Sequence, residues 1–284
     1  MAILIGLIPA LAWGILPIVA SKMGGKPSNQ ILGTTTGTFI IAFLTLIYIR
    51  PEITMQTFVL SLLSGIFWAI GQVGQYSAYV SIGVSKTMPI SSGLQLIGTT
   101  LIGVLAFSEW AGLNTKLLGF AALILVIFGI YLTSLDKSKN SQTSVDKKTF
   151  LLLFFTNFGF LAYNSIPDVV ATKGVVIFFP QALGMLVGAI GYLLFSKQTA
   201  ALKEAASWKN IASGVVFSVA ALSYILSAQL NGIATGFVLA QLSVVIATLG
   251  GIFILKEKKD QAELIATIAG LTIIVVGEII VAFL

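Results

Sequence analysis

The sequence predicts an all-α integral membrane protein with ten transmembrane helices, and three observations support this fold class. The 284 residues are 57% hydrophobic and 9% charged, with a mean hydropathy of +1.02, whereas soluble domains carry about 25% charged residues. Ten mostly apolar stretches follow one another, each close to the ~20 residues that cross a bilayer as a helix. The two halves of the chain also resemble each other. A soluble globular fold is therefore excluded.

The ten stretches leave only short connections between them. They cover residues 2–20, 31–49, 56–80, 87–107, 116–135, 149–169, 175–195, 209–229, 233–255 and 262–283. The first stretch has no Lys or Arg ahead of it, so we expect a retained helix rather than a cleaved signal peptide. The charged, Ser-rich segment 136–148 predicts a cytoplasmic linker between a first unit, 1–135, and a second unit, 149–284.

The two units match at an offset of about 150 residues, read directly from the sequence. Matched pairs include Trp13 with Tyr163, Gly33 with Gly184, Gly37 with Gly188, Gly65 with Gly214, Gly83 with Gly232 and Glu109 with Glu257. Each unit has five spans, an odd number, so the second would enter the membrane in the opposite orientation. The sequence therefore predicts two inverted five-helix repeats, an architecture of secondary transporters. A duplication that only enlarges a helical bundle is the open alternative.

Small residues within the apolar stretches predict close helix packing. Gly33 and Gly37 form one small-xxx-small pair, and Gly184 and Gly188 form its repeat. Such pairs let two helix backbones approach in lipid. The acidic residues Glu109 and Glu257 lie at ends of stretches, and we expect them to be structural groups of the helix ends.

The third stretch carries an unusual polar and aromatic face. Its members fall at helical spacing and are Trp68, Gln72, Gln75, Tyr76 and Tyr79. Amides at membrane depth need hydrogen-bond partners. Amides beside aromatic rings also suit a sugar, which offers hydroxyls to bond and C–H surfaces to stack. The open alternative is that the amides join helices and the rings are anchors at the membrane interface.

Further candidates for substrate binding come from other stretches. Gln95 shares a helical face with Ser92 and Thr99. The remaining candidates are Trp13, Tyr163, Asn164, Tyr224 and Gln241. The amides of the third stretch have no counterparts in its repeat, where Gln72 matches an alanine. An asymmetric substrate and sequence drift both explain this difference.

Two acidic residues are candidates for proton coupling, because a carboxyl within a span is costly and usually functional. Asp168 follows a proline near the end of the sixth stretch, and Glu278 lies in the last stretch. Without histidine, a carboxylate is the natural proton carrier. Two alternatives are open: Asp168 pairs with Lys173 at the membrane surface, and Glu278 extends to the outer surface.

The sequence contains no Cys and no His. This excludes disulfides, zinc sites built on these residues, and Ser-His or Cys-His catalytic pairs. We therefore expect no metal, no cofactor and no enzyme activity. The net charge of +6 is explained by cytoplasmic lysines, so we expect no nucleic-acid partner.

The distribution of basic residues predicts the orientation in the cell membrane. The connections on the same side of the membrane as the two termini contain only Arg50, Lys116 and Lys173. The other side holds Lys22, Lys26, Lys86, Lys137, Lys139, Lys147, Lys148, Lys197, Lys203, Lys209, Lys256, Lys258 and Lys259. Because basic residues concentrate on the cytoplasmic side, both termini are predicted to be extracellular.

Several segments resemble the bacterial glucose/ribose uptake proteins of the drug/metabolite transporter superfamily. These segments are residues 8–38, 64–75, 83–110, 180–185 and 232–260. The resemblance implies a ten-helix inverted-repeat transporter that imports a monosaccharide, glucose or ribose, together with protons, by alternating access. Segment 8–38 resembles the ribose members more, and segment 83–110 the glucose members. Two repeats in one chain are compatible with a functional monomer in the lipid bilayer.

Two other function classes are open. Other branches of the superfamily export small metabolites or drugs, although the first stretch lacks the acidic residue that exporters of cationic drugs use. A scaffold or sensor without transport is the other class, and the polar face of the third stretch argues against it.

Overall fold

The computed structural model describes residues 2–106, 110, 112–135, 145–169 and 174–284, without the side chains of residues 106, 167–169, 233 and 234. Ten helices in these ranges are long and apolar enough to cross a membrane, which confirms the predicted number of spans. They are α1 (Ala2–Met23), α2 (Pro27–Ile49), α3 (Met55–Ile82), α4 (Val84–Ala106), α5 (Leu113–Ser134), α6 (Lys147–Val169), α7 (Val175–Phe195), α9 (Ile211–Asn231), α10 (Ile233–Phe253) and α11 (Gln261–Ala282). Two short elements, η1 (Thr199–Lys203) and α8 (Ala205–Lys209), occupy the expected loop between α7 and α9.

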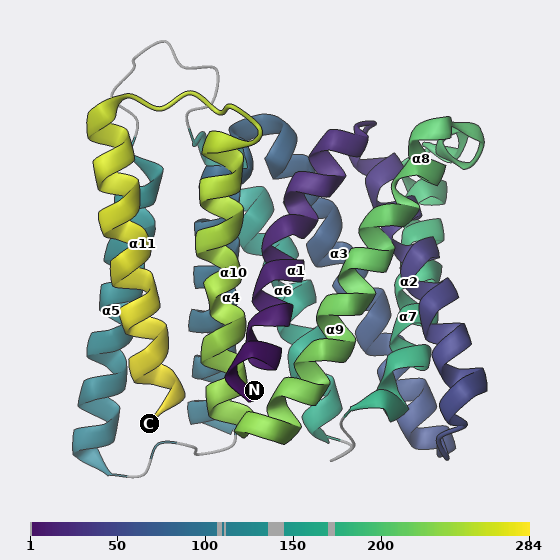
Figure 1. Cartoon of the computed structure of the whole chain (residues 1–284), viewed down its shortest axis with the longest axis horizontal. Helices are drawn as coiled ribbons and strands as arrows, with labels where there is room; N and C mark the ends of the chain where they lie inside the picture. Colours follow the sequence, from purple (N-terminus) through teal and green to yellow (C-terminus); the bar gives the residue numbers. More distant parts are fainter. Residues whose placement is uncertain (1, 107–109, 111, 136–144, 170–173) are drawn as a thin grey trace.

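The helices run across the molecule, and both chain ends lie at the same face (Figure 1). The opposite face, called the lysine-rich face below, carries connections that hold Lys26, Lys203 and Lys256. Helices α5 and α11 stand side by side at one edge (Figure 1) and pack on each other. Helices α4 and α10 pack together and link this pair to the other helices.

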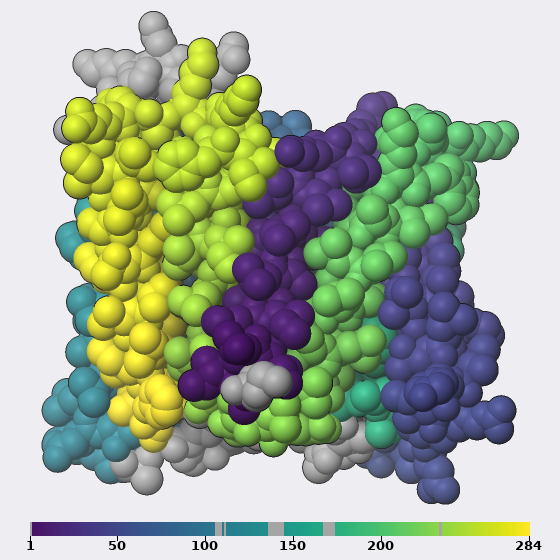
Figure 2. All heavy atoms as spheres, in the orientation of Figure 1, coloured from purple at the N-terminus to yellow at the C-terminus, as the bar shows by residue number. Residues whose placement is uncertain are grey.

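The outer surface of the molecule is apolar. Figure 2 shows one broad face, formed in part by α11, α10, α1 and α9. Large apolar side chains are exposed on several helices, among them Ile124 of α5, Phe155 of α6 and Ile265 of α11. A soluble protein would bury such residues. With the ten spans, this surface identifies a multi-pass membrane protein.

Two tight turns depend on glycine. Gly83 alone separates α3 from α4, and Gly232 alone separates α9 from α10. Both glycines have φ of 82°, a conformation that other residues rarely adopt. The chain therefore reverses within a single residue at two matched places, and the short connections predicted after the third and eighth stretches are confirmed.

The predicted glycine contacts are confirmed. A Cβ atom added to Gly33 would overlap the backbone of Ser207 and Asn210, and one added to Gly184 would overlap the backbone of Leu62. Gly37 similarly faces the backbone at the start of α9. These contacts let α2 approach α9, and α7 approach α3, closely enough for backbone-to-backbone packing.

Three of the longer helices are capped by a side chain that directly precedes them: Thr54 for α3, Asp146 for α6 and Asp260 for α11. Asp146 accepts a hydrogen bond from the backbone N–H of Thr149 at 2.9 Å. Hydrogen bonds from the side chain and backbone of Thr149 hold the pKa of Asp146 below its ordinary value. Such caps stabilise a helix from within its own chain segment.

The largest buried cluster lies in the middle of the molecule. Its residues come from eight helices and are Leu16, Ala20, Ile31, Trp68, Ala69, Tyr76, Tyr79, Val84, Met88, Phe160, Met185, Ala189, Phe217 and Ala247. Helices α5 and α11 contribute no residue to it. The third stretch, α3, contributes four members, including the three aromatic residues that the sequence singled out.

Candidate functional site

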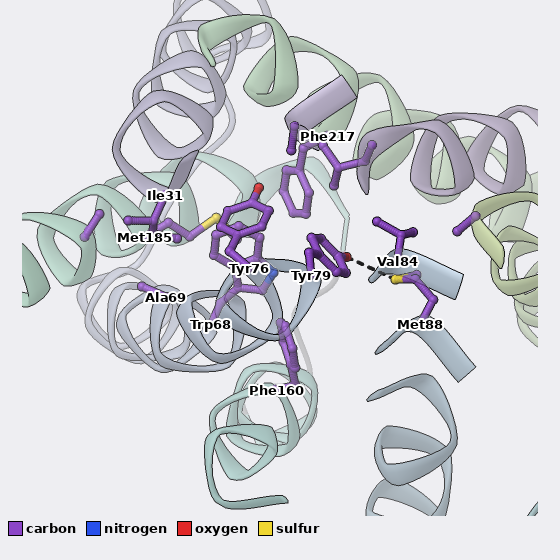
Figure 3. Packing of buried hydrophobic residues seen from close by; sticks show 14 residues of the cluster. Ile31, Trp68, Ala69, Tyr76, Tyr79, Val84, Met88, Phe160, Met185 and Phe217 are labelled. Atoms are coloured by element: carbon purple, nitrogen blue, oxygen red, sulfur yellow. Dashed lines mark hydrogen bonds between the residues drawn. The ribbon is translucent and has the colours of Figure 1, made fainter. Parts of the chain in front are cut away.

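An aromatic cluster surrounds α3 at the centre of the bundle (Figure 3). Trp68, near the middle of α3, packs on Phe217 of α9 with ring centroids 5.0 Å apart. Phe160 from α6 and Trp68 form an edge-to-face pair with ring centroids 6.4 Å apart. About two and three turns further along α3, Tyr76 and Tyr79 pack edge-on with ring centroids 5.9 Å apart. Helices from both halves of the chain therefore meet around α3.

A chain of amide and hydroxyl groups continues from this cluster into α4. The amide of Gln72 donates to the side-chain oxygen of Gln75 at 3.0 Å, within one helical turn. Gln75 in turn donates to the Ser91 hydroxyl at 3.0 Å, and Gln95 donates to the same hydroxyl at 3.4 Å. Gln72 and Gln75 are buried, whereas Gln95, near the middle of α4, is half-buried.

This polar chain fits both interpretations of the glutamines. The bond from Gln75 to Ser91 joins α3 to α4, as expected for amides that hold helices together. Glutamine nevertheless offers two N–H donors and one acceptor, more than these bonds use. Each amide can therefore bond a sugar hydroxyl without breaking the chain. The helical spacing predicted Ser92 rather than Ser91 beside Gln95, and only the packing of α4 on α3 shows that Ser91 faces the glutamines.

Tyr76 is fully buried and has a defined partner. Its hydroxyl lies 2.8 Å from the Thr34 hydroxyl of α2. The Tyr79 hydroxyl donates to the sulfur of Met88 at 3.1 Å, a contact drawn as a dashed line in Figure 3. Both tyrosines thus connect α3 to neighbouring helices, and their ring faces take part in the central cluster.

The candidates from α1, α6 and α9 lie around the same cluster. Trp13 packs on Tyr224 with ring centroids 5.4 Å apart, which joins α1 to α9. Trp13 and Tyr163 are partly buried against the central cluster. Tyr163 also accepts, at its backbone carbonyl, a hydrogen bond of 2.9 Å from Ser64 of α3. The structure therefore brings together most of the aromatic candidates.

Two candidates lie apart from these contacts. Asn164 is exposed, and Gln241 of α10 is half-buried. Gln181 of α7 has a role that its position in the sequence did not predict. This side chain is buried and donates to the Ser64 hydroxyl at 3.0 Å, which links α7 through α3 to α6.

The two acidic candidates have different positions. The side chain of Asp168 lies outside the described residues, and its backbone lies at the end of α6. Glu278 is fully buried in α11, and neither carboxyl oxygen has a hydrogen-bond partner within the described residues. The alternative in which Glu278 extends to the outer surface is therefore wrong.

The helix segment around Glu278 packs against α5. Next to it, a Cβ atom added to Gly277 would contact Val126 at 2.6 Å and the carbonyl of Ala122 at 3.0 Å, so this part of α11 lies against α5. A buried carboxylate without a hydrogen-bond partner is costly within a membrane span. The helix that carries Glu278, α11, contributes no residue to the central cluster.

A separate groove of about 270 Å³ lies between α10 and α11. Its lining is almost wholly apolar, with Leu249 and Val275 among its residues. The hydroxyl of Thr272, also in the lining, already donates to the carbonyl of Ile268 at 2.9 Å. Because a sugar needs many hydrogen-bond partners, this groove suits a lipid acyl chain and not the substrate.

Comparison with known proteins identifies the family. The family model for a sugar transport protein matches residues 4–284. The chain belongs to this family. It is therefore a member of a family of membrane transport proteins and not an enzyme, and the resemblance to sugar uptake proteins is confirmed.

Relatives match along their whole length. A candidate sugar uptake protein of Lactobacillus helveticus is 46% identical over 278 residues, covering 98% of this chain and 99% of the relative. A candidate ribose uptake protein, RbsU, of Latilactobacillus sakei is 46% identical over 288 residues, covering 99% and 98%. One solved crystal structure superposes with a TM-score of 0.65 at 14% identity, covering 100% of this chain and 98% of the other. This last likeness concerns the fold alone.

Proposed function

We propose that this protein imports a monosaccharide, glucose or ribose, through the centre of the bundle. The observation that carries the proposal is the chain from Gln72 through Gln75 and Ser91 to Gln95, beside the aromatic cluster around Trp68. Amides and a hydroxyl at this depth can replace the water that sugar hydroxyls lose, and aromatic rings can stack on the C–H faces of the sugar. The names of the relatives point to the same substrate class.

Transport by alternating access is the second part of the proposal, with units 1–135 and 149–284 as inverted repeats. The packing of helices supports it, because exchanging the two halves maps the most extensive helix pairs onto one another. Helix α1 packs on α9 as α6 packs on α3, and α2 packs on α9 as α7 packs on α3. The pairs α2–α7, α4–α10 and α5–α11 each join two matched helices, so exchanging the halves maps each pair onto itself. The matched turns at Gly83 and Gly232 agree with this relation.

Proton coupling is the third part, with Asp168 and Glu278 as candidates. The uncompensated burial of Glu278 supports a carboxyl that binds a proton within the membrane. Its position on α11 separates it from the central cluster, so coupling through Glu278 requires movement of the α5–α11 pair relative to the other helices. Asp168 follows Tyr163 on α6 by about one helical turn and a half. Coupling through Asp168 would be more direct.

The orientation follows from the lysines. With 13 of the basic residues on one side and Arg50, Lys116 and Lys173 on the other, the lysine-rich face lies in the cytoplasm and both termini lie outside. In this orientation the plasma membrane is the location that uptake requires.

The test is uptake of radiolabelled glucose and ribose by the purified protein in liposomes, with and without an inward proton gradient. Gln75→Met is expected to lower uptake at least tenfold, because it removes the amide and keeps the side-chain volume. The matched control is Gln181→Met, a buried glutamine that also donates to a serine, at the interface of α7 with α3. Its uptake should stay near that of the wild type.

Asp168→Asn and Glu278→Gln separate the proton candidates. The variant that abolishes stimulation by the gradient identifies the coupling residue. If neither sugar enters, the substrate assignment fails, and efflux of small metabolites from loaded liposomes then tests the exporter alternative. If Gln75→Met transports like the wild type, the glutamines only hold helices together.

A further inference from the structure

We propose that Glu257 is a positioning residue of the transport cycle, which holds the lysine-rich end of the protein closed. Its carboxylate belongs to the second half of the chain and binds the first residues of α4 in the first half. We call this contact, formed by Glu257 with the backbone N–H groups of Val84 and Ser85, the α4 cap. The inference rests on the alternating access proposed above.

The geometry of the α4 cap is specific for a carboxylate. The N–H of Val84 donates to one carboxylate oxygen at 2.6 Å, and the N–H of Ser85 donates to the other at 2.9 Å. The first N–H groups of a helix have no partner inside the helix and carry a partial positive charge. A carboxylate satisfies two of them and binds about twice as strongly as a neutral acceptor.

Two glycines make room for the carboxylate. A Cβ atom added to Gly83 would lie 2.8 Å from the side-chain carboxyl carbon of Glu257. One added to Gly251 would lie 3.0 Å from a carboxylate oxygen and 2.9 Å from the nitrogen of Ser85. The backbone N–H of Glu257 itself donates to the Gly251 carbonyl at 3.1 Å, which holds the residue against the end of α10.

The origin of the cap distinguishes α4 from other long helices. Helices α3, α6 and α11 take their caps from the residue directly before them. The residue before α4 is Gly83, which has no side chain to offer. The start of α4 therefore depends on a residue that lies 172 and 173 positions away from its two donors. A cap of this kind stabilises α4 and also ties the two halves together.

A second contact between the halves lies at the same face. Asn29, at the start of α2, donates to Glu204 at 2.6 Å and to Ser207 of α8 at 3.0 Å. Asn210 donates to the carbonyl of Gly24, after α1, at 3.0 Å. Figure 1 shows α8 and the connection from α10 to α11 at this end of the molecule. Opening this end by separating the halves requires that these bonds, including both bonds of the α4 cap, break.

The sequence offers a clean test because the chain contains no Cys. Ser85→Cys provides a single reporter, since Ser85 is buried beside the cap and its N–H donor is kept. The reaction rate of this thiol with a hydrophilic maleimide is measured on protein in nanodiscs, where both faces are accessible. The rate is compared for Ser85→Cys alone and combined with Glu257→Gln. The matched control is Asp260→Asn, in the same connection, whose side chain caps only its own helix.

We expect Glu257→Gln to raise the labelling rate roughly tenfold. Glutamine has one neutral acceptor oxygen, whereas the carboxylate accepts two charge-assisted hydrogen bonds. Asp260→Asn should leave the labelling rate unchanged, since asparagine caps helices as well as aspartate does. An unchanged rate in Glu257→Gln overturns the proposal. So does an equal rise in both variants, which would indicate general loosening of the connection.

Uptake measurements separate this inference from the proposed function. We expect Glu257→Gln to change the maximal rate of sugar uptake more than its KM, because Val84 and Ser85 lie about two helical turns before Ser91, the partner of Gln75. Raised labelling with no uptake of either sugar by the wild type would keep the α4 cap and reject the sugar assignment. Unchanged labelling together with wild-type uptake kinetics would reject the α4 cap and keep the sugar assignment.

Discussion

Replacement of Glu278 by methionine should make the protein more stable. Both carboxyl oxygens of this residue are buried and without a hydrogen-bond partner within the described residues, and the side chain is fully enclosed. A buried polar group without a partner costs about 1–3 kcal/mol in measured protein variants. Methionine has a similar length and no polar hydrogen-bonding group to desolvate, so Glu278→Met should recover most of this free energy.

The assay is thermal unfolding of the purified protein in detergent. At about 2–4 °C per kcal/mol for chains of a few hundred residues, the Tm of Glu278→Met should rise by at least about 2 °C. Glu52→Met is the matched control, because Glu52 is exposed in the connection between α2 and α3, and its Tm should not change. A lower Tm for Glu278→Met than for the control would refute the reasoning, since it would show that the carboxyl makes stabilising contacts.

The same variant connects stability to function. If Glu278 carries the coupled proton, Glu278→Met loses stimulation of uptake by a proton gradient while its Tm rises. A destabilising group retained at a functional site is the expected trade-off. If stimulation persists, Asp168 remains the coupling candidate.

Three further predictions concern packing, a hydrogen bond and a cap. Gly184→Ala should destabilise the protein by about 1–3 kcal/mol through overlap with α3, measured as a fall in Tm, whereas Gly191→Ala on the same helix has open space and should change little. Tyr76→Phe should cost about 0.5–1.5 kcal/mol through loss of the bond to Thr34, and a Tm equal to that of the wild type would contradict this. Because the pKa of Asp146 is lowered, its charged carboxylate stabilises α6 at pH values above the ordinary pKa of aspartate. This stabilisation is lost as the pH falls through the lowered pKa. Asp146→Asn should therefore remove part of the acid-induced loss of stability, and an unchanged Tm profile between pH 2 and 5 would contradict the role of the cap.

Much of the fold follows from local properties of the sequence. A span is recognised from about 20 consecutive apolar residues, which is a property of one segment alone. The contacts of Gly33 and Gly184 were also predictable, because a small residue in an apolar helix marks where another backbone approaches. The sequence could not give the short helices η1 and α8, whose segment has neither the length nor the periodicity that identifies a helix.

The candidate site was predicted in part. Helical spacing correctly placed Gln72, Gln75 and Tyr76 on the inner side of α3, since the period of a helix fixes which residues share a face. It could not decide between Ser91 and Ser92, because that choice depends on the rotation of α4 against α3. The polar link from Gln181 through Ser64 was missed for the same reason.

The sequence by itself determined the solvent of this protein, the number of its spans and the faces of its helices, because hydropathy and periodicity are summed along one segment. Only the tertiary structure decided which faces meet. It placed the carboxylate of Glu257 on the start of α4, and it buried Glu278 in α11 with no hydrogen-bond partner among the described residues. Contacts between residues far apart in the chain leave no periodic signal in the sequence, because they depend on the relative position and rotation of whole helices.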